Sequence, residues 1–247
     1  MLTIGSLAFR PPFPKLCVPI TATSREDLQS QCQALQHRKY DLIEFRYDYF
    51  GAAMSATHVH TVLATLRREL PHVPLLFTLR TEKEGGKYAL PEIEYAKITQ
   101  AALADAAVDA IDMEYTLSPA LRTPLCRQAQ AHNLPVVLSF HNFRETPSHA
   151  SVQQQLEAMY ACRPAITKVA YMPQTPQDVL TVFQCSLQFT RRHPQAPLIA
   201  LSMGNLGRIT RIGGTVFGSI MTFADGVRPS APGQLPADLL YTLRDYV

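Results

Sequence analysis

The sequence lacks the features that mark membrane-spanning and exported proteins. No apolar run among its 247 residues approaches the ~18 residues that a membrane span needs. Near the N-terminus, Arg10 and Lys15 follow a short apolar segment that Gly5 and several prolines interrupt, which is the wrong order for a signal peptide. We therefore expect neither a membrane span nor a secretory signal.

Paired cysteines and dense positive charge are also absent. The five cysteines are an odd number without a CxxC motif, and Cys17 and Cys162 lie in apolar runs. This usage indicates reduced, mostly buried thiols and a cytoplasmic protein. The net charge of +3 is spread thinly, with pairs such as Arg67-Arg68 as its densest groupings, so we expect no nucleic acid and no membrane as partner.

What the sequence does contain is a regular alternation of two patterns. Short apolar runs typical of buried strands cover residues 16–20, 42–48, 75–80, 110–115, 136–141, 165–172, 198–203 and 217–223. Helical patterns follow them at about 24–38, 57–70, 91–107, 119–132, 148–160, 175–191, 205–212 and 236–246. A strand or hairpin arm is predicted at residues 2–9, with a stiff proline-rich link at 11–14.

Eight strands alternating with eight helices are typical of the α/β class and of a (β/α)8 TIM barrel. We therefore predict a single barrel domain over residues 1–247, with a short N-terminal strand or hairpin extension. An open doubly wound sheet is the alternative. It would normally have a glycine-rich phosphate loop after the first strand, where this chain has Thr21-Ala22-Thr23-Ser24.

Charged residues recur on one face of the predicted strands. Because successive side chains of a strand point to opposite faces, the apolar set of residues 42–48 faces the helices, and Glu44, Arg46 and Asp48 face the barrel interior. The same spacing places further polar side chains inside: Arg80, Asp112, Glu114, His141 and Lys168. Taken singly, each is also explained by a buried ion pair. Together they lie toward the C-terminal strand ends, where barrel active sites assemble.

Lys168 is the most unusual member of this set, because it lies inside an apolar run bounded by Pro164 and Pro173. Burial disfavours the ammonium form, and the neutral amine is a nucleophile. A strand-end lysine that reaches water is the ordinary alternative. With His141 on the neighbouring strand and arginines nearby, the pattern favours imine chemistry on an anionic carbonyl substrate. A metal site is disfavoured, since the other histidines fall on predicted helices or loops.

Six segments follow one another in order over nearly the whole chain: Glu44-Phe45-Arg46, residues 77–86 (FTLRTEKEGG), residues 139–143 (SFHNF), residues 168–173 (KVAYMP), Phe217-Gly218-Ser219 and residues 230–234 (SAPGQ). Together they resemble the type I 3-dehydroquinate dehydratase family. The resemblance implies a cytoplasmic homodimeric barrel of the shikimate pathway of aromatic amino acid biosynthesis. Such an enzyme dehydrates 3-dehydroquinate to 3-dehydroshikimate by syn elimination of water, without metal or cofactor.

The resemblance also assigns roles to residues of this chain. Lys168 matches the lysine that forms the imine, His141 matches the general base and acid, and Glu84 matches the carboxylate beside that histidine. The remaining matches are substrate-binding residues: Glu44, Arg46 and Arg80 on the hydroxyl and carbonyl side, Arg211 for the carboxylate, Met203 and Phe223 as apolar walls, and Ser230 and Gln234 on a closing loop. One departure is Asn142, where many relatives are expected to have Asp.

Two other functions are compatible with a barrel of this kind. A class I aldolase also uses a barrel lysine, but it usually takes phosphorylated sugars. The predicted loops after the last two strands lack a phosphate cradle, because Gly213-Gly214 precedes the eighth strand. A non-catalytic binding module is the third possibility, and loss of the lysine or the histidine would be expected in it.

Overall fold

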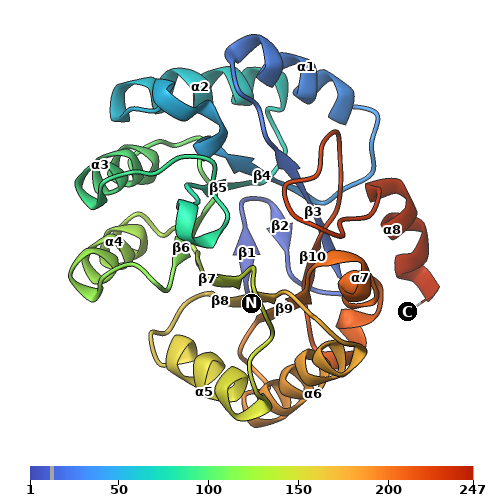
Figure 1. Ribbon diagram of the computed structural model, residues 1–247. Helices are drawn as coiled ribbons and strands as arrows, with labels where there is room; N and C mark the ends of the chain where they lie inside the picture. Colours follow the sequence, from blue (N-terminus) through green and yellow to red (C-terminus); the bar gives the residue numbers. More distant parts are fainter. Residues whose placement is uncertain (12–13, 247) are drawn as a thin grey trace.

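Eight parallel strands form the centre of the molecule (Figure 1). They are β3 (Lys15–Ile20), β4 (Leu42–Arg46), β5 (Leu75–Thr78), β6 (Ala110–Glu114), β7 (Val136–Asn142), β8 (Ile166–Tyr171), β9 (Leu198–Ser202) and β10 (Met221–Phe223). In this computed structural model, which describes residues 1–11 and 14–246, the strands pair in chain order and β10 pairs with β3. A bridge between Leu198 and Ser219 links β9 to the segment before β10. The sheet is thus a TIM-like barrel, as predicted, and not an open doubly wound sheet.

Helices surround the barrel, one after each strand (Figure 1). They are α1 (Arg25–Leu35), α2 (Ala56–Glu69), α3 (Glu92–Leu103), α4 (Pro119–Ala131), α5 (His149–Tyr160), α6 (Pro176–Arg192), α7 (Gly204–Gly213) and α8 (Ala237–Leu243). Ser24 caps α1 as predicted, since its side chain accepts a hydrogen bond from the backbone N–H of Asp27. Within the described residues, no helix is long and apolar enough to cross a membrane.

The strands separate two apolar layers, as their period-2 pattern requires. Residues such as Ile43 and Phe45 pack outward against the helices. The alternate residues fill the barrel interior, where Leu42, Leu76 and Ile166 belong to a second cluster. This inner cluster fills the barrel below the charged side chains.

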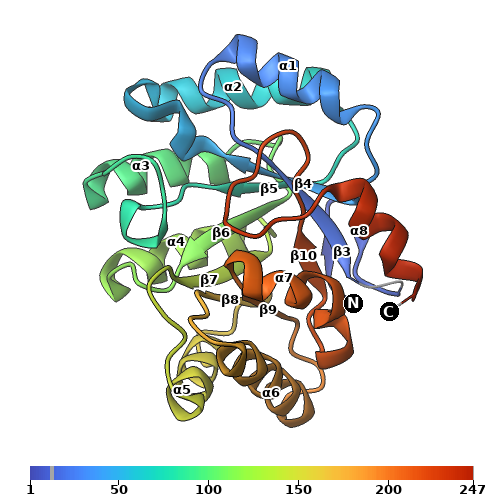
Figure 2. The ribbon, with the colours of Figure 1, turned by 45° about the vertical axis from the view of Figure 1, so that its right-hand side comes forward.

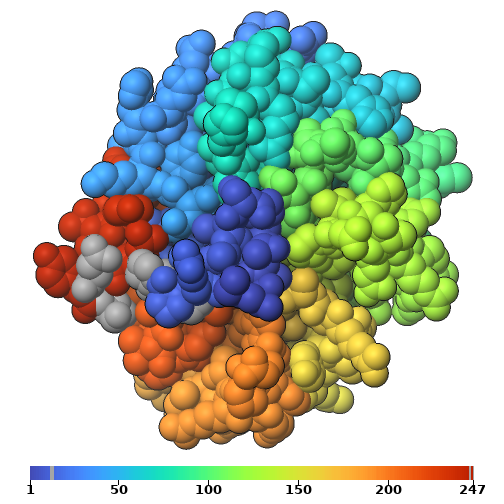
Figure 3. Space-filling model, turned by 180° about the vertical axis from the view of Figure 1, so that it is seen from behind, coloured from blue at the N-terminus to red at the C-terminus, as the bar shows by residue number. Residues whose placement is uncertain are grey.

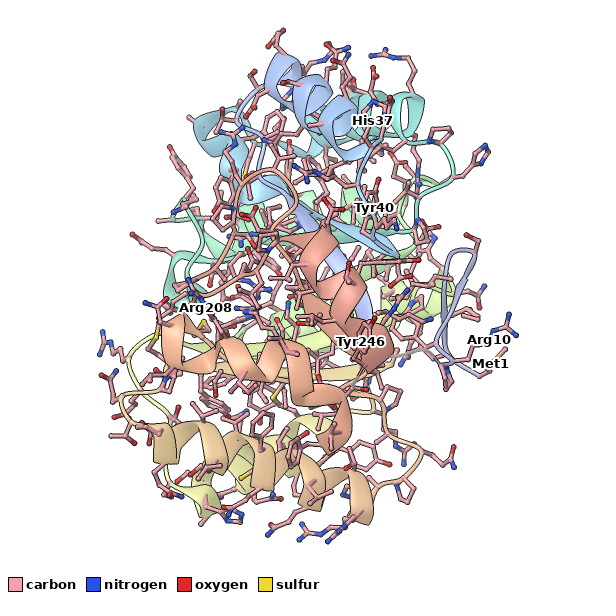
Figure 4. The ribbon with its side chains drawn as sticks, turned by 90° about the vertical axis from the view of Figure 1, so that its right-hand side faces the viewer. Met1, Arg10, His37, Tyr40, Arg208 and Tyr246 are labelled. Atoms are coloured by element: carbon pink, nitrogen blue, oxygen red, sulfur yellow. The ribbon has the colours of Figure 1, made fainter. Side chains whose placement is uncertain are left out.

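An N-terminal hairpin covers one end of the barrel. It consists of β1 (Thr3–Ile4) and β2 (Leu7–Ala8), which pair antiparallel. Figure 3 shows the hairpin over the middle of the face seen from behind, and Figure 4 shows Met1 and Arg10 at the end opposite to Arg208 on α7. The Ile4 side chain is fully buried in the inner cluster, so the predicted extension acts as the floor of the barrel.

The eighth strand begins later than predicted. Instead of a run over 217–223, a 3-10 turn, η3 (Gly214–Phe217), precedes β10. Gly218 breaks the extended backbone with a φ of +95°, and a Cβ there would lie 2.4 Å from the Thr190 side chain. The glycine therefore ends the turn where a side chain would not fit.

Two other strands end two residues earlier than predicted. The run over 42–48 ends at Arg46, where η1 (Tyr47–Ala53) begins, and the run over 75–80 ends at Thr78. The side chains of Asp48 and Arg80 are buried all the same. Residues 12 and 13 of the predicted link at 11–14 lie outside the described residues.

The buried hairpin gives a test of the barrel floor. Ile4→Ala removes a fully buried side chain from the inner cluster, and we expect a loss of about 2–5 kcal/mol in the free energy of unfolding. Ile93, which is 66% exposed on α3, provides the control, because Ile93→Ala should change stability by about 0.5 kcal/mol or less. Urea denaturation measures both. Equal stability of the two variants would show that the hairpin is not part of the core.

Candidate active site

A pocket of about 450 Å³ opens at the C-terminal ends of the strands. The structure brings every site residue named from the sequence into its wall: Glu44, Arg46, Arg80, Glu84, His141, Lys168, Met203, Arg211, Phe223, Ser230 and Gln234. Four lining residues were not named from the sequence: Phe143, Ala170, Leu201 and Ala231.

Lys168 lies in the middle of β8 with its side chain turned into the barrel. Its Nζ is 3.1 Å from Asp112 Oδ2 and 3.7 Å from Glu44 Oε1. The Nζ also lies 4.1 Å from the centre of the Phe223 ring. The amine is almost wholly buried, so it is held by two carboxylates and an aromatic face instead of water. The alternative of a lysine that reaches the solvent is therefore wrong.

Asp112 joins Lys168 to Arg80. Its second oxygen, Oδ1, is 2.8 Å from Arg80 Nη2 and accepts a hydrogen bond of 2.6 Å from the Ser139 hydroxyl. Arg80 Nη1 lies 3.1 Å from Glu114 Oε1. Burial raises the pKa of Asp112, but Arg80 and Lys168 outweigh that effect and the pKa is lowered. Asp112 therefore stays ionised between the two cations.

His141 and Glu84 form a second pair in the pocket. Glu84 Oε2 lies 2.9 Å from His141 Nδ1 and accepts the backbone N–H of the same residue at 3.1 Å. Burial, aided by Glu114, raises the pKa of Glu84 to about 8, and burial with the nearby Arg80 lowers that of His141 well below 6.5. Because Nδ1 is bound to Glu84, Nε2 is the ring nitrogen that can exchange a proton with a bound molecule.

Phe143 covers the histidine. The two rings are stacked, with centroids 6.4 Å apart and an interplanar angle of 25°. Phe143 can approach because Gly85 has no side chain and a φ of +86°, and a Cβ on Gly85 would lie 2.4 Å from the Phe143 ring. Both residues occur in segments that carry the family resemblance, but their contact has no signal in the sequence.

Asn142 faces away from this pair. Its Oδ1 accepts the backbone N–H groups of Arg144 and Glu145 at 2.9 and 3.2 Å, which shapes the turn after β7. An Asn side chain can make these bonds as well as an Asp side chain can. The departure from the expected Asp therefore preserves the turn.

Arg46 is held rigidly at the rim of the pocket. Its Nε and Nη2 donate to the two oxygens of Asp48 at 2.7 and 2.8 Å, and its guanidinium lies 5.0 Å from the centre of the Tyr49 ring. Burial opposes the charge, but Asp48 outweighs it and raises the pKa of Arg46. The early end of β4 makes this geometry possible, because η1 brings Asp48 back beside Arg46.

Arg211, on α7, is a cation of a different kind. Its hydrogen bonds go to carbonyl oxygens: Nη1 donates to Phe223 at 3.1 Å and Nη2 to Pro232 at 3.0 Å. Among the residues that the structure describes, no carboxylate forms an ion pair with it, and its buried Nε has no hydrogen-bond partner. Burial lowers the pKa of Arg211 to about 10. This guanidinium is suited to bind an anion.

The loop over residues 225–236 lies across the end of the barrel (Figure 2). Gln234 Oε1 accepts the backbone N–H of Ser230 at 2.7 Å, and Gln234 Nε2 donates to the Ser230 hydroxyl at 3.2 Å. The backbone N–H of Gly204 donates to Pro232 at 3.1 Å. A Cβ on Gly233 would lie 2.2 Å from the carbonyl oxygen of Gly204, so the loop and the start of α7 meet backbone to backbone.

Comparison with known proteins identifies the family. A family model of type I 3-dehydroquinase matches residues 16–246. The chain belongs to the type I 3-dehydroquinase family. It is 34% identical to a 3-dehydroquinate dehydratase of Enterococcus faecalis over 92% of this chain and 90% of that protein. It is 33% identical to one of Klebsiella pneumoniae, with coverage of 99% and 97%.

Solved 3-dehydroquinate dehydratases have the same architecture. That of Geobacillus kaustophilus is 32% identical, with a TM-score of 0.90 and coverage of 95% of this chain and 91% of that one. The type I enzyme of Clostridium difficile is 28% identical, with a TM-score of 0.93 and coverage of 99% and 96%. The comparisons therefore support an enzyme of the type I 3-dehydroquinase family, and they do not favour the aldolase or the binding module.

The contribution of the charge network in this type I 3-dehydroquinase pocket can be tested by measuring the free energy of unfolding. Asp112→Asn leaves Arg80 and Lys168 without their shared carboxylate, and we expect a loss of about 3–5 kcal/mol. Asp238→Asn is the matched control, because its pair with Arg38 is about half exposed and should contribute about 1 kcal/mol or less. Denaturant unfolding measures both, and similar losses would contradict a special role for Asp112.

Proposed function

We propose that this protein removes water from 3-dehydroquinate, giving 3-dehydroshikimate, through an imine formed by Lys168. The observation that carries the proposal is one pocket with a buried amine, a histidine paired to a carboxylate and an arginine that has no acidic partner among the described residues. The printed names of the relatives supply the substrate. The Clostridium difficile relative was solved with covalently modified comenic acid, which is consistent with a nucleophilic side chain in that protein.

The proposed reaction starts at the Lys168 amine. The Lys168 ammonium gives up one proton and the neutral amine attacks the ketone carbon; loss of one water and return of that proton to the nitrogen leave a protonated imine. The imine draws electron density from the adjacent C–H bond, so its proton becomes acidic enough for a neutral imidazole to remove. The electron pair of that bond then expels the neighbouring hydroxyl, and His141 returns the proton to it as water leaves on the same side. Hydrolysis of the imine releases the product and restores the amine.

Binding roles follow from the charges and shapes of the pocket wall. Arg211 has donors and charge but no acidic partner in the part of the chain that the structure describes, so it is assigned the substrate carboxylate. Arg46, Arg80 and Glu44 line the side where hydroxyl and carbonyl oxygens are bound, and Met203 and Phe223 provide apolar walls. Ser230 and Gln234 bring neutral hydrogen-bonding groups from the covering loop, which excludes water from the imine.

The family resemblance supports three broader inferences. The protein acts in the shikimate pathway of aromatic amino acid biosynthesis, it is a homodimer in the cytoplasm, and its reaction requires no metal or cofactor. Within the described residues, no cluster of three His, Cys, Asp or Glu side chains is placed to hold a metal ion. The charges that the chemistry needs come from the Lys168, Arg46, Arg80 and Arg211 side chains.

The imine can be trapped chemically. Borohydride added with 3-dehydroquinate should leave a stable adduct on the tryptic peptide that contains Lys168, detected by mass spectrometry. Lys168→Met should give neither adduct nor turnover, measured by the absorbance of the enone product. The control is Lys97→Met, since Lys97 is an exposed residue on α3 and this variant should keep both. An adduct on a different lysine would reject the assignment.

A second experiment distinguishes the role of His141 from that of Lys168. Proton transfer by a positioned side chain typically contributes about 10²- to 10⁴-fold, whereas the imine is a distinct covalent step. His141→Ala should therefore turn over at least about a hundredfold more slowly and still be trapped by borohydride. His132→Ala, outside the pocket, should have normal kcat. Near-normal turnover of His141→Ala would rule out its role as base.

A further inference from the structure

Glu84 faces two sides of the protein with its two oxygens. Oε2 binds His141 at Nδ1 and at the backbone N–H, inside the pocket. Oε1 accepts a hydrogen bond of 2.5 Å from the hydroxyl of Thr116, which lies in the loop after β6. The carboxylate is only 2% exposed, so these partners take the place of water around it.

Thr116 reaches Glu84 from outside the pocket. It is an exposed residue and lines a separate cleft of about 530 Å³, together with residues such as Lys83, Glu92 and Leu117. None of the residues that line this cleft also lines the active-site pocket. Glu84 is thus part of the wall between the two spaces, and its outer oxygen is reached by a residue in contact with solvent.

Some of the other groups around Glu84 favour its ionised form, and others favour its protonated form. Arg80 Nη1 lies 3.7 Å away and favours the ionised carboxylate, and His141 faces the same oxygen. Glu114 and Asp112 on β6 repel its negative charge, and burial disfavours it further. A hydroxyl that donates to a carboxylate stabilises the ionised form, because a protonated carboxyl accepts hydrogen bonds less strongly.

We propose that Thr116 is a positioning residue for the His141–Glu84 pair, which it keeps in its working state by donating a hydrogen bond from outside the pocket. In that state, ionised Glu84 accepts Nδ1–H and leaves Nε2 free of a proton, as a base requires. A protonated Glu84 cannot do so equally well, and the histidine is then a poorer base. This inference rests on the proposed role of His141.

The pH dependence of kcat/KM tests the proposal. The pKa of Glu84, raised to about 8 by burial and by Glu114, makes wild-type kcat/KM rise with pH through this region as the pair loses its shared proton. Thr116→Val keeps the shape of the side chain but removes the donor. Its midpoint should move upward by about one pH unit, so that activity at pH 7 falls by roughly tenfold and recovers at higher pH.

Three further variants make the result specific. Thr116→Ser retains the hydroxyl and should keep the wild-type midpoint, and Thr116→Ala should reproduce the shift without adding a methyl group. Thr242→Val on α8 is the control, because this exposed threonine donates only to a backbone carbonyl of its own helix. An unchanged midpoint in Thr116→Val, or an equal loss of activity at every pH, would overturn the proposal.

Borohydride trapping separates this inference from the proposed function. Thr116→Val should still be trapped at Lys168, since the hydroxyl acts on the proton-transfer pair and not on the amine. Wild-type protein that is trapped at Lys168 and whose midpoint does not respond to Thr116→Val would reject the positioning role alone. Wild-type protein that is neither trapped nor active would reject the proposed function.

Discussion

Asp112 binds Arg80 with one oxygen and Lys168 with the other, in a part of the barrel that bulk water does not reach. Each of these three groups would be expensive to bury in ionised form alone, and Asp112 offers each of the two cations a carboxylate oxygen at a separation of about 3 Å. The strand register makes this possible. Thr78 of β5 pairs with Asp112 of β6, whereas Lys168 of β8 is level with Ser139 of β7 and Glu114 of β6, so Arg80 and Lys168 both start two residues beyond Asp112 and their long side chains meet its carboxylate. The buried amine is thus held by the same contacts that let the barrel close around it.

Some arginines of the pocket are paired with carboxylates and one is not, and this difference indicates the charge of the ligand. Arg46 and Arg80 each face carboxylates, whereas Arg211 has only carbonyl oxygens among its partners within the described chain. A neutral ligand would leave that guanidinium without a counter-charge, and an acid would supply one. The pocket therefore favours an anionic molecule with its negative charge on the Arg211 side. A hydroxylated cyclic keto acid carries such a charge.

The fold and the inner face of the site were predictable because both follow from periodicity. Alternation of short apolar runs with helical patterns defines a barrel, and period 2 within a strand places Glu44 beside the interior and Phe45 beside the helices. Contacts made by loops have no such rule. The return of Asp48 to Arg46, the stacking of Phe143 on His141 and the approach of Thr116 to Glu84 depend on backbone turns after the strands. The late start of the eighth strand could not be predicted for the same reason, because it depends on the positive φ of Gly218.

The hairpin at the other end of the barrel limits the route by which small molecules can reach the pocket. Ile4 and the inner apolar cluster fill the barrel beneath the charged residues, so no route for a polar molecule leads through the floor formed by the described residues. A small molecule that reaches or leaves Lys168 must therefore pass through the opening of the pocket at the C-terminal strand ends, beside the loop that touches Gly204. Entry and exit therefore share one path, and a molecule bound in the pocket blocks access to Lys168 until it leaves.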